Sequence, residues 1–481
     1  MTAPDETART PPGSEPRHGH PDRHVLGSQR TQGVVPFRDA LRAWFSISLQ
    51  TFGGPAGQIA VMQRELVEER RWIGQRRFLH ALSYCTLLPG PEAQQLAIYV
   101  GWLLNGVRGG LVAGSLFVLP GVVALLVLSG LYVTAGDTLV VTSLFAGLAP
   151  AVLAIVTQAV VRVGGRALGH PALIGLAVAA FVALAAFSVP FPVVVAAAAG
   201  VGWALGRWAP HTMETAQGHG ERDGGPPPLI PDDTLHHEQP HRSHTVRVIA
   251  LGLLAWGLPV GLVAWLTGAH SIFTDQALFF SGAALVTFGG AYAVLAYVAQ
   301  RAVEVYAWLA PGEMVRGLAL AETTPGPLIM VVQFVAFVGA YRSPGALDPW
   351  AAAVLAALLA TWVTFVPCFV FVFAGAPYVE RLRGNHALSA ALTGITAAVV
   401  GVIANLAVFF ALHTLFGDTV SVSMGPATLE VPDLATVKPM AVAITILAAV
   451  LLFSLKWSVL RTLAACAAVG VALGVAQSLI G

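Results

Sequence analysis

The chain of 481 residues is too apolar for a soluble domain, because 56% of its residues are hydrophobic, only 11% are charged and the mean hydropathy is +0.73. The formal net charge of +1 favours no nucleic-acid partner. Three cysteines, Cys85, Cys368 and Cys466, stand singly in apolar segments, a spacing that fits neither a disulfide framework nor a zinc site. The composition therefore predicts a membrane protein and indicates no metal ion and no cofactor.

Two polar stretches divide the chain. Residues 1–36 are rich in Pro, Gly, His and charged residues and lack the apolar core of a signal peptide, so we predict a disordered tail. Residues 209–245 form a second polar stretch whose histidines could hold a metal ion, but their irregular, Pro/Gly-rich spacing favours a solvated cytoplasmic linker. We therefore expect two repeats, 37–208 and 271–481, joined by this linker and a connecting transmembrane helix at 246–270.

Apolar segments fill the rest of the chain, and most of them have the 18 or more residues that about 30 Å of hydrocarbon requires. In chain order they are 40–63, 78–105, 109–133, 138–161, 171–188 and 191–207, then 246–268 after the linker, then 276–299, 314–340, 350–374, 386–412, 436–455 and 460–479. This pattern predicts an all-α polytopic membrane protein with about six helical segments in each repeat.

One set of motifs occurs twice. Phe-Gly-Gly at 52–54, Trp72 and Pro-Gly-Pro at 89–91 return as Phe-Gly-Gly at 288–290, Trp308 and Pro-Gly-Pro at 325–327, each 236 positions later. Equivalent elements are separated by an odd number of segments, so we predict that the two repeats are inverted in the membrane. Broken helices at matching places of two inverted repeats are typical of the substrate site of a transporter.

Loop charges indicate the orientation but leave one conflict. Most basic loops fall on one side if the N-terminus is cytoplasmic, as the positive-inside rule requires. The loop Arg64–Arg77 holds five arginines, yet it would be external if the segment 40–63 crossed the membrane once. The conflict disappears if 40–63 and 78–105 are re-entrant hairpins that turn at their Gly-Gly-Pro and Pro-Gly-Pro motifs. Kinked helices that span the membrane remain the alternative.

A helix that begins inside the membrane presents free N–H groups and the positive end of its macrodipole. Several such ends near the midplane form an anion site that needs no buried arginine. Pro55 and Pro91 are suited to the first position of a half-helix. Tight packing of glycines between helices is the alternative reading of the same residues. The predicted substrate site comprises Gly53, Gly54, Pro55, Pro89, Gly90, Pro91, Gly289, Gly290, Pro325, Gly326 and Pro327.

Three runs of residues resemble the chromate ion transporter (CHR) family: FGGPAGQIA at 52–60, PGPEAQQLAIYVG at 89–101 and TPGPL at 324–328. The resemblance covers nearly all of 37–480 and follows the long, two-domain form of the family. It implies efflux of chromate from the cytoplasm, driven by the membrane potential or the proton gradient. Chromate is indicated by the resemblance alone, since the residues themselves indicate only a small anion, of the tetrahedral oxyanion type.

Behind the first Pro-Gly-Pro, Glu92, Gln95 and Tyr99 share one helical face. Gln95 and Tyr99 are neutral donors that could bind oxyanion oxygens. Glu92 is either a dipole partner at a helix start or a carboxylate that exchanges a proton against the anion. The second repeat has Leu328 at the equivalent position, and its nearest acid is Glu322, so we expect the halves to differ in function.

The arginines of the basic loops have two interpretations. They are topology signals, or they attract an anion that approaches from the cytoplasm. On the second interpretation Arg70, Arg71 and Arg108 form the electrostatic entrance. Near the C-terminal end, alternating Val and Ser at 420–423, followed by Gly-Pro and residues 427–431, predicts a short β-hairpin.

Functions other than secondary transport are less well supported by the sequence. No catalytic triad, phosphate loop or metal-ligand cluster indicates an enzyme, so no catalytic residue is predicted. A sulfate or other small-anion permease and an anion channel stay open as alternatives, because inverted repeats with half-helices also build pores. We expect the inner cell membrane as the location, a small inorganic anion and the lipid bilayer as partners, and we leave a homodimer open.

An odd number of membrane crossings places the two ends of the chain on opposite faces in both the hairpin and the spanning interpretation. We therefore expect a reporter fused at Met1 to be active on the cytoplasmic side and one fused at Gly481 on the opposite side. Activity of both reporters on one side would contradict the inverted repeat.

Overall fold

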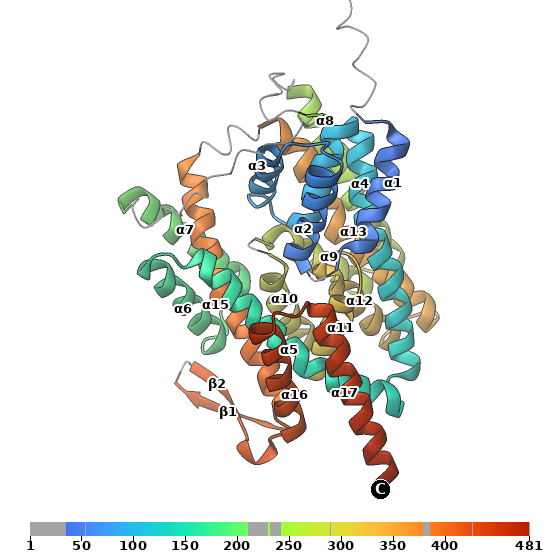
Figure 1. Ribbon diagram of the computed structural model, residues 1–481, viewed down its shortest axis with the longest axis vertical. Coiled ribbons are helices and arrows are strands. Elements are labelled where there is room, and N and C mark those ends of the chain that lie inside the picture. The colour runs from blue at the N-terminus through green and yellow to red at the C-terminus, as the bar shows by residue number, and fades with distance from the viewer. Residues whose placement is uncertain are drawn as a thin grey trace, which may run out of the picture.

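A computed structural model describes residues 35–52, 54–209, 229–230, 242–288, 290–378, 385–425 and 427–480, and these are almost entirely helical (Figure 1). Most of the predicted tail and linker lies outside the described residues. Within them, seven helices are long and apolar enough to cross a membrane. The chain is therefore an all-α, multi-pass membrane protein, as the apolar segments predict.

The first half contains seven helices. They are α1 (Phe37–Gln50), α2 (Gly54–Gln63), α3 (Gln75–Cys85), α4 (Glu92–Ala135), α5 (Leu139–Ala167), α6 (Pro171–Ala185) and α7 (Phe191–Trp208), with a π-helical extension of α2 over Arg64–Glu69. The segments predicted at 40–63 and 78–105 are each divided in two, at the Gly-Gly-Pro and Pro-Gly-Pro motifs respectively.

The second half follows α8 (Arg242–Thr267) and repeats this order. It contains α9 (Ile272–Val286), α10 (Ala291–Gln300), α11 (Pro311–Thr323), α12 (Val331–Arg342), α13 (Pro349–Gly375), α15 (His386–Leu415), α16 (Pro439–Ala449) and α17 (Val459–Ile480). The antiparallel strands β1 (Thr419–Met424) and β2 (Ala427–Pro432) lie between α15 and α16 and confirm the predicted β-hairpin. Thr428 N–H binds the carbonyl of Ala186, which fixes the hairpin to the end of α6.

The helix α4 is two helices joined by a sharp turn. Asn105 and Gly106 have non-helical backbone angles, and Gly106 has a φ of 62°. A Cβ added at Gly101 would lie 2.6 Å from the Gly109 carbonyl oxygen and from the Ala113 Cβ. Residues 101 and 113 would be about 18 Å apart in a continuous helix. Residues 92–104 and 107–135 therefore pack side by side in opposite directions.

The chain also folds back between α1 and α2. The Arg64 side chain donates to Gln50 Oε1 at 2.6 Å, and Gln50 Nε2 lies 3.3 Å from Glu65 Oε1. In one continuous helix, residues 50 and 64 would be about 21 Å apart. This geometry favours the re-entrant interpretation of 40–63 over a kinked spanning helix.

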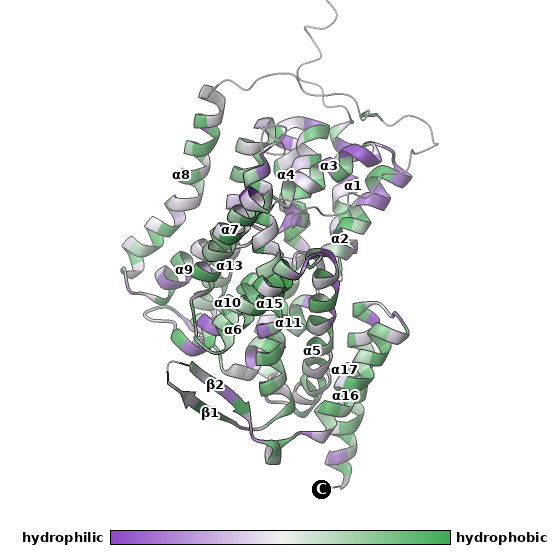
Figure 2. Cartoon of the chain, turned by 90° about the vertical axis from the view of Figure 1, so that its left-hand side faces the viewer, coloured by the Kyte–Doolittle hydropathy of each residue, from purple (hydrophilic) through white to green (hydrophobic). Residues whose placement is uncertain are grey.

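The basic loop that follows α2 lies on the side of the linker. Leu229 and Ile230 N–H groups donate to the carbonyls of Arg71 and Trp72 at 3.1 Å each. Figure 1 shows α3 and the start of α8 near one end of the molecule, and the β-hairpin and the C-terminus near the other. In Figure 2, hydrophilic residues gather at the end with α1 and α3, while most of α17 is hydrophobic.

Equivalent helices of the two halves pack across to the opposite half. The pair α6–α7 packs on α15, and the pair α16–α17 packs on α5. Gly394 of α15 contacts Gly202 of α7, and Gly147 of α5 lies against the Cys466 backbone of α17. Small residues let these backbones approach closely, which is how helices gain contact where lipid supplies no hydrophobic force.

The position of the basic loop can be tested by labelling. In a chain whose three native cysteines are replaced by alanine, Glu68→Cys and Arg76→Cys introduce thiols at exposed positions of this loop. We expect an impermeant maleimide to label both only from the linker side, because α1 and α2 turn back before crossing.

Glu430→Cys on β2 is the matched control and should be labelled only from the opposite side. If the control and the loop thiols react from the same side, the re-entrant interpretation is wrong.

Candidate functional site

All four helix breaks contain a glycine in a conformation that other residues rarely adopt. The φ angles are 73° at Gly54, 120° at Gly90, 106° at Gly290 and 106° at Gly326. A Cβ is unfavourable at such angles, so these glycines permit the chain to leave the helix within a turn. Gly53 and Gly289, which the sequence also places in the site, lie outside the described residues.

The breaks of the two halves bind each other. Gly90 N–H of the first Pro-Gly-Pro donates to the Thr287 carbonyl before the second Phe-Gly-Gly at 2.8 Å. Gly326 N–H of the second Pro-Gly-Pro donates to the Thr51 carbonyl before the first Phe-Gly-Gly at 3.0 Å. These two bonds are equivalent under the repeat, and each joins a break of one half to a break of the other.

Each Pro-Gly-Pro loop also rests on a long helix of the other half. The position of a Gly90 Cβ would be 2.9 Å from Cys368 Sγ, the residue after Pro367 in α13. A Cβ on Gly121, the residue after Pro120 in α4, would meet the Pro325 carbonyl oxygen at 2.6 Å. The intrahelical prolines and the small residues behind them therefore make room for the loops.

The helices begin one residue away from the predicted starts. Pro91 has φ −71° and ψ 105°, so it caps α4 and Glu92 is the first helical residue. Likewise, α2 begins at Gly54, which makes Pro55 its second residue, and Pro327 caps a short 3₁₀ turn before α12. The prediction of proline at the first helical position is therefore wrong by one residue, because the ring fixes φ without requiring helical ψ.

Polar groups at the start of α4 are buried without partners. Ala93 and Gln94 are 2% and 0% exposed, and within the described residues their N–H groups reach no acceptor. Both side-chain polar atoms of Gln94 also lack a partner. Buried polar groups in a native fold are nearly always bonded, so unpaired donors in one helical turn indicate a missing ligand or water.

Two further glutamines surround the breaks. Gln58 of α2 donates to the Gly326 carbonyl, and Gln95 of α4 donates to the Pro89 carbonyl at 2.6 Å. The Oε1 atoms of both side chains are buried and unpaired. Gln95 therefore holds the first Pro-Gly-Pro loop in shape, a supporting role that the sequence, which suggested a direct contact with the anion, does not reveal.

Tyr99 is farther along the same helix and is packed between aromatic rings. Its ring centroid is 5.4 Å from that of Tyr84 and 5.8 Å from that of Trp102. Two turns of helix separate it from Pro91, about 12 Å along the axis. Tyr99 thus belongs to the apolar core of the first half, and the structure does not bring it to the breaks.

Each half contributes one acid next to its Pro-Gly-Pro. Glu92 follows the first directly and is half-buried. Glu322 precedes the second, is 2% exposed and accepts a hydrogen bond of 2.6 Å from the Tyr292 hydroxyl, while its Oε2 has no partner. The sequence singled out Glu322 but did not reveal its contact with the Tyr292 hydroxyl, because Tyr292 lies in the first turn of α10 and meets the acid only through the fold.

The predicted entrance arginines lie at the surface on the linker side. Arg70 pairs with Glu65 at 3.3 Å and lies over the Trp72 ring at 5.2 Å. Arg108 is exposed just after the turn inside α4, and its neighbour Gly109 packs against Gly101, which is about 14 Å along the helix from Glu92. Its side chain therefore cannot reach the breaks, although it can contribute to the surface field.

Metal binding finds no support in the described residues, where no group of three or more His, Cys, Asp or Glu side chains could hold an ion. Of the histidines in the linker, only His244 lies within them, at the start of α8. The unpaired donors at the start of α4 are side-chain amide and backbone N–H groups, which suit an anion.

A bundle of membrane-length helices, with four broken helices that meet at buried polar groups, has the build of a secondary transporter. The chain belongs to the Chromate transporter family, which matches residues 38–203 and 274–471. It is 31% identical to a chromate transport protein of Pseudomonas aeruginosa, over 78% of this chain and 81% of that protein. It is 26% identical to a chromate transport protein of Cupriavidus metallidurans, over 82% and 88% of the two chains.

A probable chromate transport protein of Synechococcus elongatus is 25% identical over 76% of this chain and 82% of its own length. No solved structure matches this chain. The sequence resemblance to the chromate ion transporter family is therefore confirmed, and the chain is one of a family of transporters rather than enzymes.

Gly90 offers a direct test of the breaks. In Gly90→Ala the φ of 120° becomes unfavourable, and the new Cβ would lie 2.8 Å from Gln95 Nε2 and 2.9 Å from Cys368 Sγ. We expect the free energy of unfolding to fall by about 1–3 kcal/mol in an SDS titration of the purified protein.

Gly165→Ala, in α5 with no neighbour close to the new Cβ, is the control and should be neutral or stabilising. Equal stability of the two variants would show that the strain at Gly90 is not real.

Proposed function

We propose that this protein exports chromate from the cytoplasm across the inner cell membrane, and that export is coupled to the proton gradient or the membrane potential. The observation that carries the proposal is the group of buried, unpaired donors behind the first Pro-Gly-Pro, at Ala93 and Gln94. Such donors bind an oxyanion without a compensating charge, since the helix macrodipole supplies about half a positive charge. The relatives named for chromate transport give the substrate.

An anion at these donors comes close to a carboxylate. Repulsion between Glu92 and a dianion at 4 Å is on the order of 4 kcal/mol per unit of charge at an effective dielectric near 20. We infer that Glu92 takes up a proton when the anion binds and releases it when the anion leaves. The buried acid Glu322 can serve the second half in the same way, held by Tyr292.

The direction of transport rests on the surface charge. Arg71, Arg76 and Arg77 belong to the loop that touches the linker, and that side is cytoplasmic by the positive-inside rule. A basic surface raises the local concentration of anions, so it favours loading from the cytoplasm. The ion pairs Arg70–Glu65 and Arg64–Glu69 remove part of this field.

Sulfate uptake is the second candidate, because sulfate is also a tetrahedral dianion and would meet the same donors. Inverted membrane vesicles distinguish the two. A chromate exporter accumulates labelled chromate in vesicles that carry a gradient and stops when an ionophore collapses it. A passive permease or a channel equilibrates the anion without a gradient.

Glu92→Gln mimics the protonated acid and tests the coupling. We expect the variant to exchange chromate for chromate at a rate near that of the native protein, because the helix start is intact. Gradient-driven uptake into inverted vesicles should lose its dependence on pH, measured between pH 6 and 8 as about a tenfold or greater loss of the driven component.

Glu68→Gln, in the exposed π-helical turn, is the matched control and should behave like the native protein. Unchanged pH dependence in Glu92→Gln would reduce Glu92 to a helix cap, and the coupling role would then pass to Glu322.

A further inference from the structure

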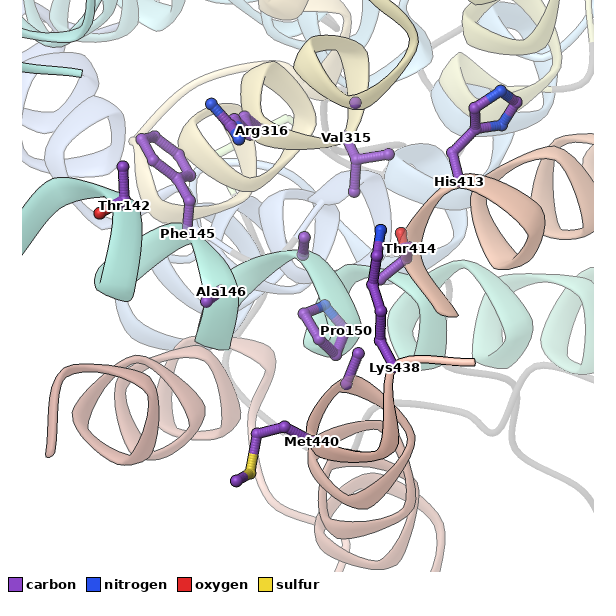
Figure 3. Close-up of a pocket in the computed structure, with 13 residues that line it drawn as sticks. Thr142, Phe145, Ala146, Pro150, Val315, Arg316, His413, Thr414, Lys438 and Met440 are labelled. Carbon is purple, nitrogen blue, oxygen red and sulfur yellow. The ribbon is translucent and has the colours of Figure 1, made fainter. Parts of the chain in front are cut away.

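A cavity of about 320 Å³ lies away from the helix breaks, among α5, α11, α15 and α16 (Figure 3). Its wall is largely apolar and includes Phe145, Pro150 and Val315, but Arg316, Lys438 and His413 also line it. It lies near the β-hairpin, because Lys438 follows the short bridge between Phe416 and Val437 at the base of that hairpin. None of these residues belongs to the motifs that repeat in the sequence.

The charge of Arg316 is not neutralised by its neighbours. Glu313, one turn earlier in α11, is bound by Arg342 through two hydrogen bonds of 2.6 and 2.7 Å and by the Tyr132 hydroxyl at 2.7 Å. Arg316 has only a distant contact of 3.4 Å with that hydroxyl and lies over the Phe145 ring at 5.8 Å. Within the described residues, no carboxylate lies within ion-pair distance of Arg316.

Lys438 provides the second cation. Figure 3 shows its side chain extending from the start of α16 toward Thr414 and Val315, while Arg316 lies above Phe145 on α11. The described structure gives Lys438 no ion pair either. His413 lies at the far edge, where its ring nitrogen bonds the Phe409 carbonyl at 2.8 Å. Two unpaired cations on an apolar wall are therefore the main charges of the cavity.

Backbone groups add to this positive character. The cavity is lined by the first turns of two helices: Gly312 in α11, and Met440 and Ala441 in α16. Their N–H ends place partial positive charge at the wall. The end of α15 opposes this effect, but the Lys438 N–H already binds its Leu415 carbonyl at 2.7 Å. No carboxylate is among the described residues that line the cavity.

We propose that this cavity is a second binding site for a small dianionic oxyanion, with Arg316 and Lys438 as its charged ligands. The inference extends the proposed function, because an anion that leaves the helix breaks toward the β-hairpin would meet a further site before release. Basic residues on the side away from the linker are unexpected from the positive-inside rule, and anion binding accounts for them.

Equilibrium binding of labelled sulfate to the purified full chain in lipid nanodiscs tests the site. We expect two classes of site in the native protein. In Arg316→Gln/Lys438→Gln one class should weaken by at least about ten- to hundredfold, since each lost charge-assisted hydrogen bond accounts for roughly that factor. The pair Lys456→Gln/Arg461→Gln, exposed residues outside the cavity, removes the same charge and should change neither class.

A second measurement leaves the cations in place. Met440→Cys, in a chain without native cysteines, should react faster with an anionic thiosulfonate than with a cationic one, and sulfate should slow the anionic reagent. Binding by the double variant equal to that of its control, or equal rates of the two reagents, would overturn the proposal. If the binding and labelling results are both as expected but the protein does not transport chromate, only the proposed function is contradicted.

Discussion

The reciprocal hydrogen bonds between the broken helices are the constraint on which the rest of this protein depends. Backbone that leaves a helix inside a membrane must find partners in the protein, because lipid offers none. Here each half satisfies the other, through Gly90 with Thr287 and Gly326 with Thr51. Neither half could place its breaks alone, since the acceptor for each loop comes from the opposite repeat. The same arrangement leaves a few donors unpaired, and those are the groups available to an anion.

Packing of helices from one half on a long helix of the other half stabilises the region of the helix breaks. The pair α6–α7 packs on α15 and the pair α16–α17 packs on α5, so each long helix is held by elements of the other half. Glycines at 147, 202 and 394 permit these close contacts. In the membrane such packing replaces the hydrophobic effect as the force that joins helices. The centre can therefore contain unsatisfied polar groups, because the contacts that hold the halves together lie elsewhere.

The two halves have the same framework but different chemistry. The acid follows the Pro-Gly-Pro in the first half, at Glu92, and precedes it in the second, at Glu322. The residues that support the loops also differ, since Gly121 lies against one loop and Cys368 against the other. The residues that line the basic cavity beside α11 and α16 do not belong to the repeated motifs, and they are a further difference between the halves, on the side of the β-hairpin. Such asymmetry is compatible with a transporter that binds its anion on one side and releases it on the other.

The sequence by itself determined the class of fold, the four breaks, the β-hairpin and the family, because hydropathy, helix-breaking residues and local alternation are properties of short stretches of chain. The repeat at 52–91 and 288–327 even located the breaks to within a residue or two. Only the tertiary structure decided what these breaks touch. Several findings depend on contacts in the folded chain. Tyr292 binds Glu322, and Gln95 supports the first Pro-Gly-Pro loop. Tyr99 and Arg108 lie far from the breaks, and Glu313 pairs with Arg342, which leaves Arg316 without an ion pair. Those contacts join residues far apart in the chain, and no local pattern of side chains encodes them.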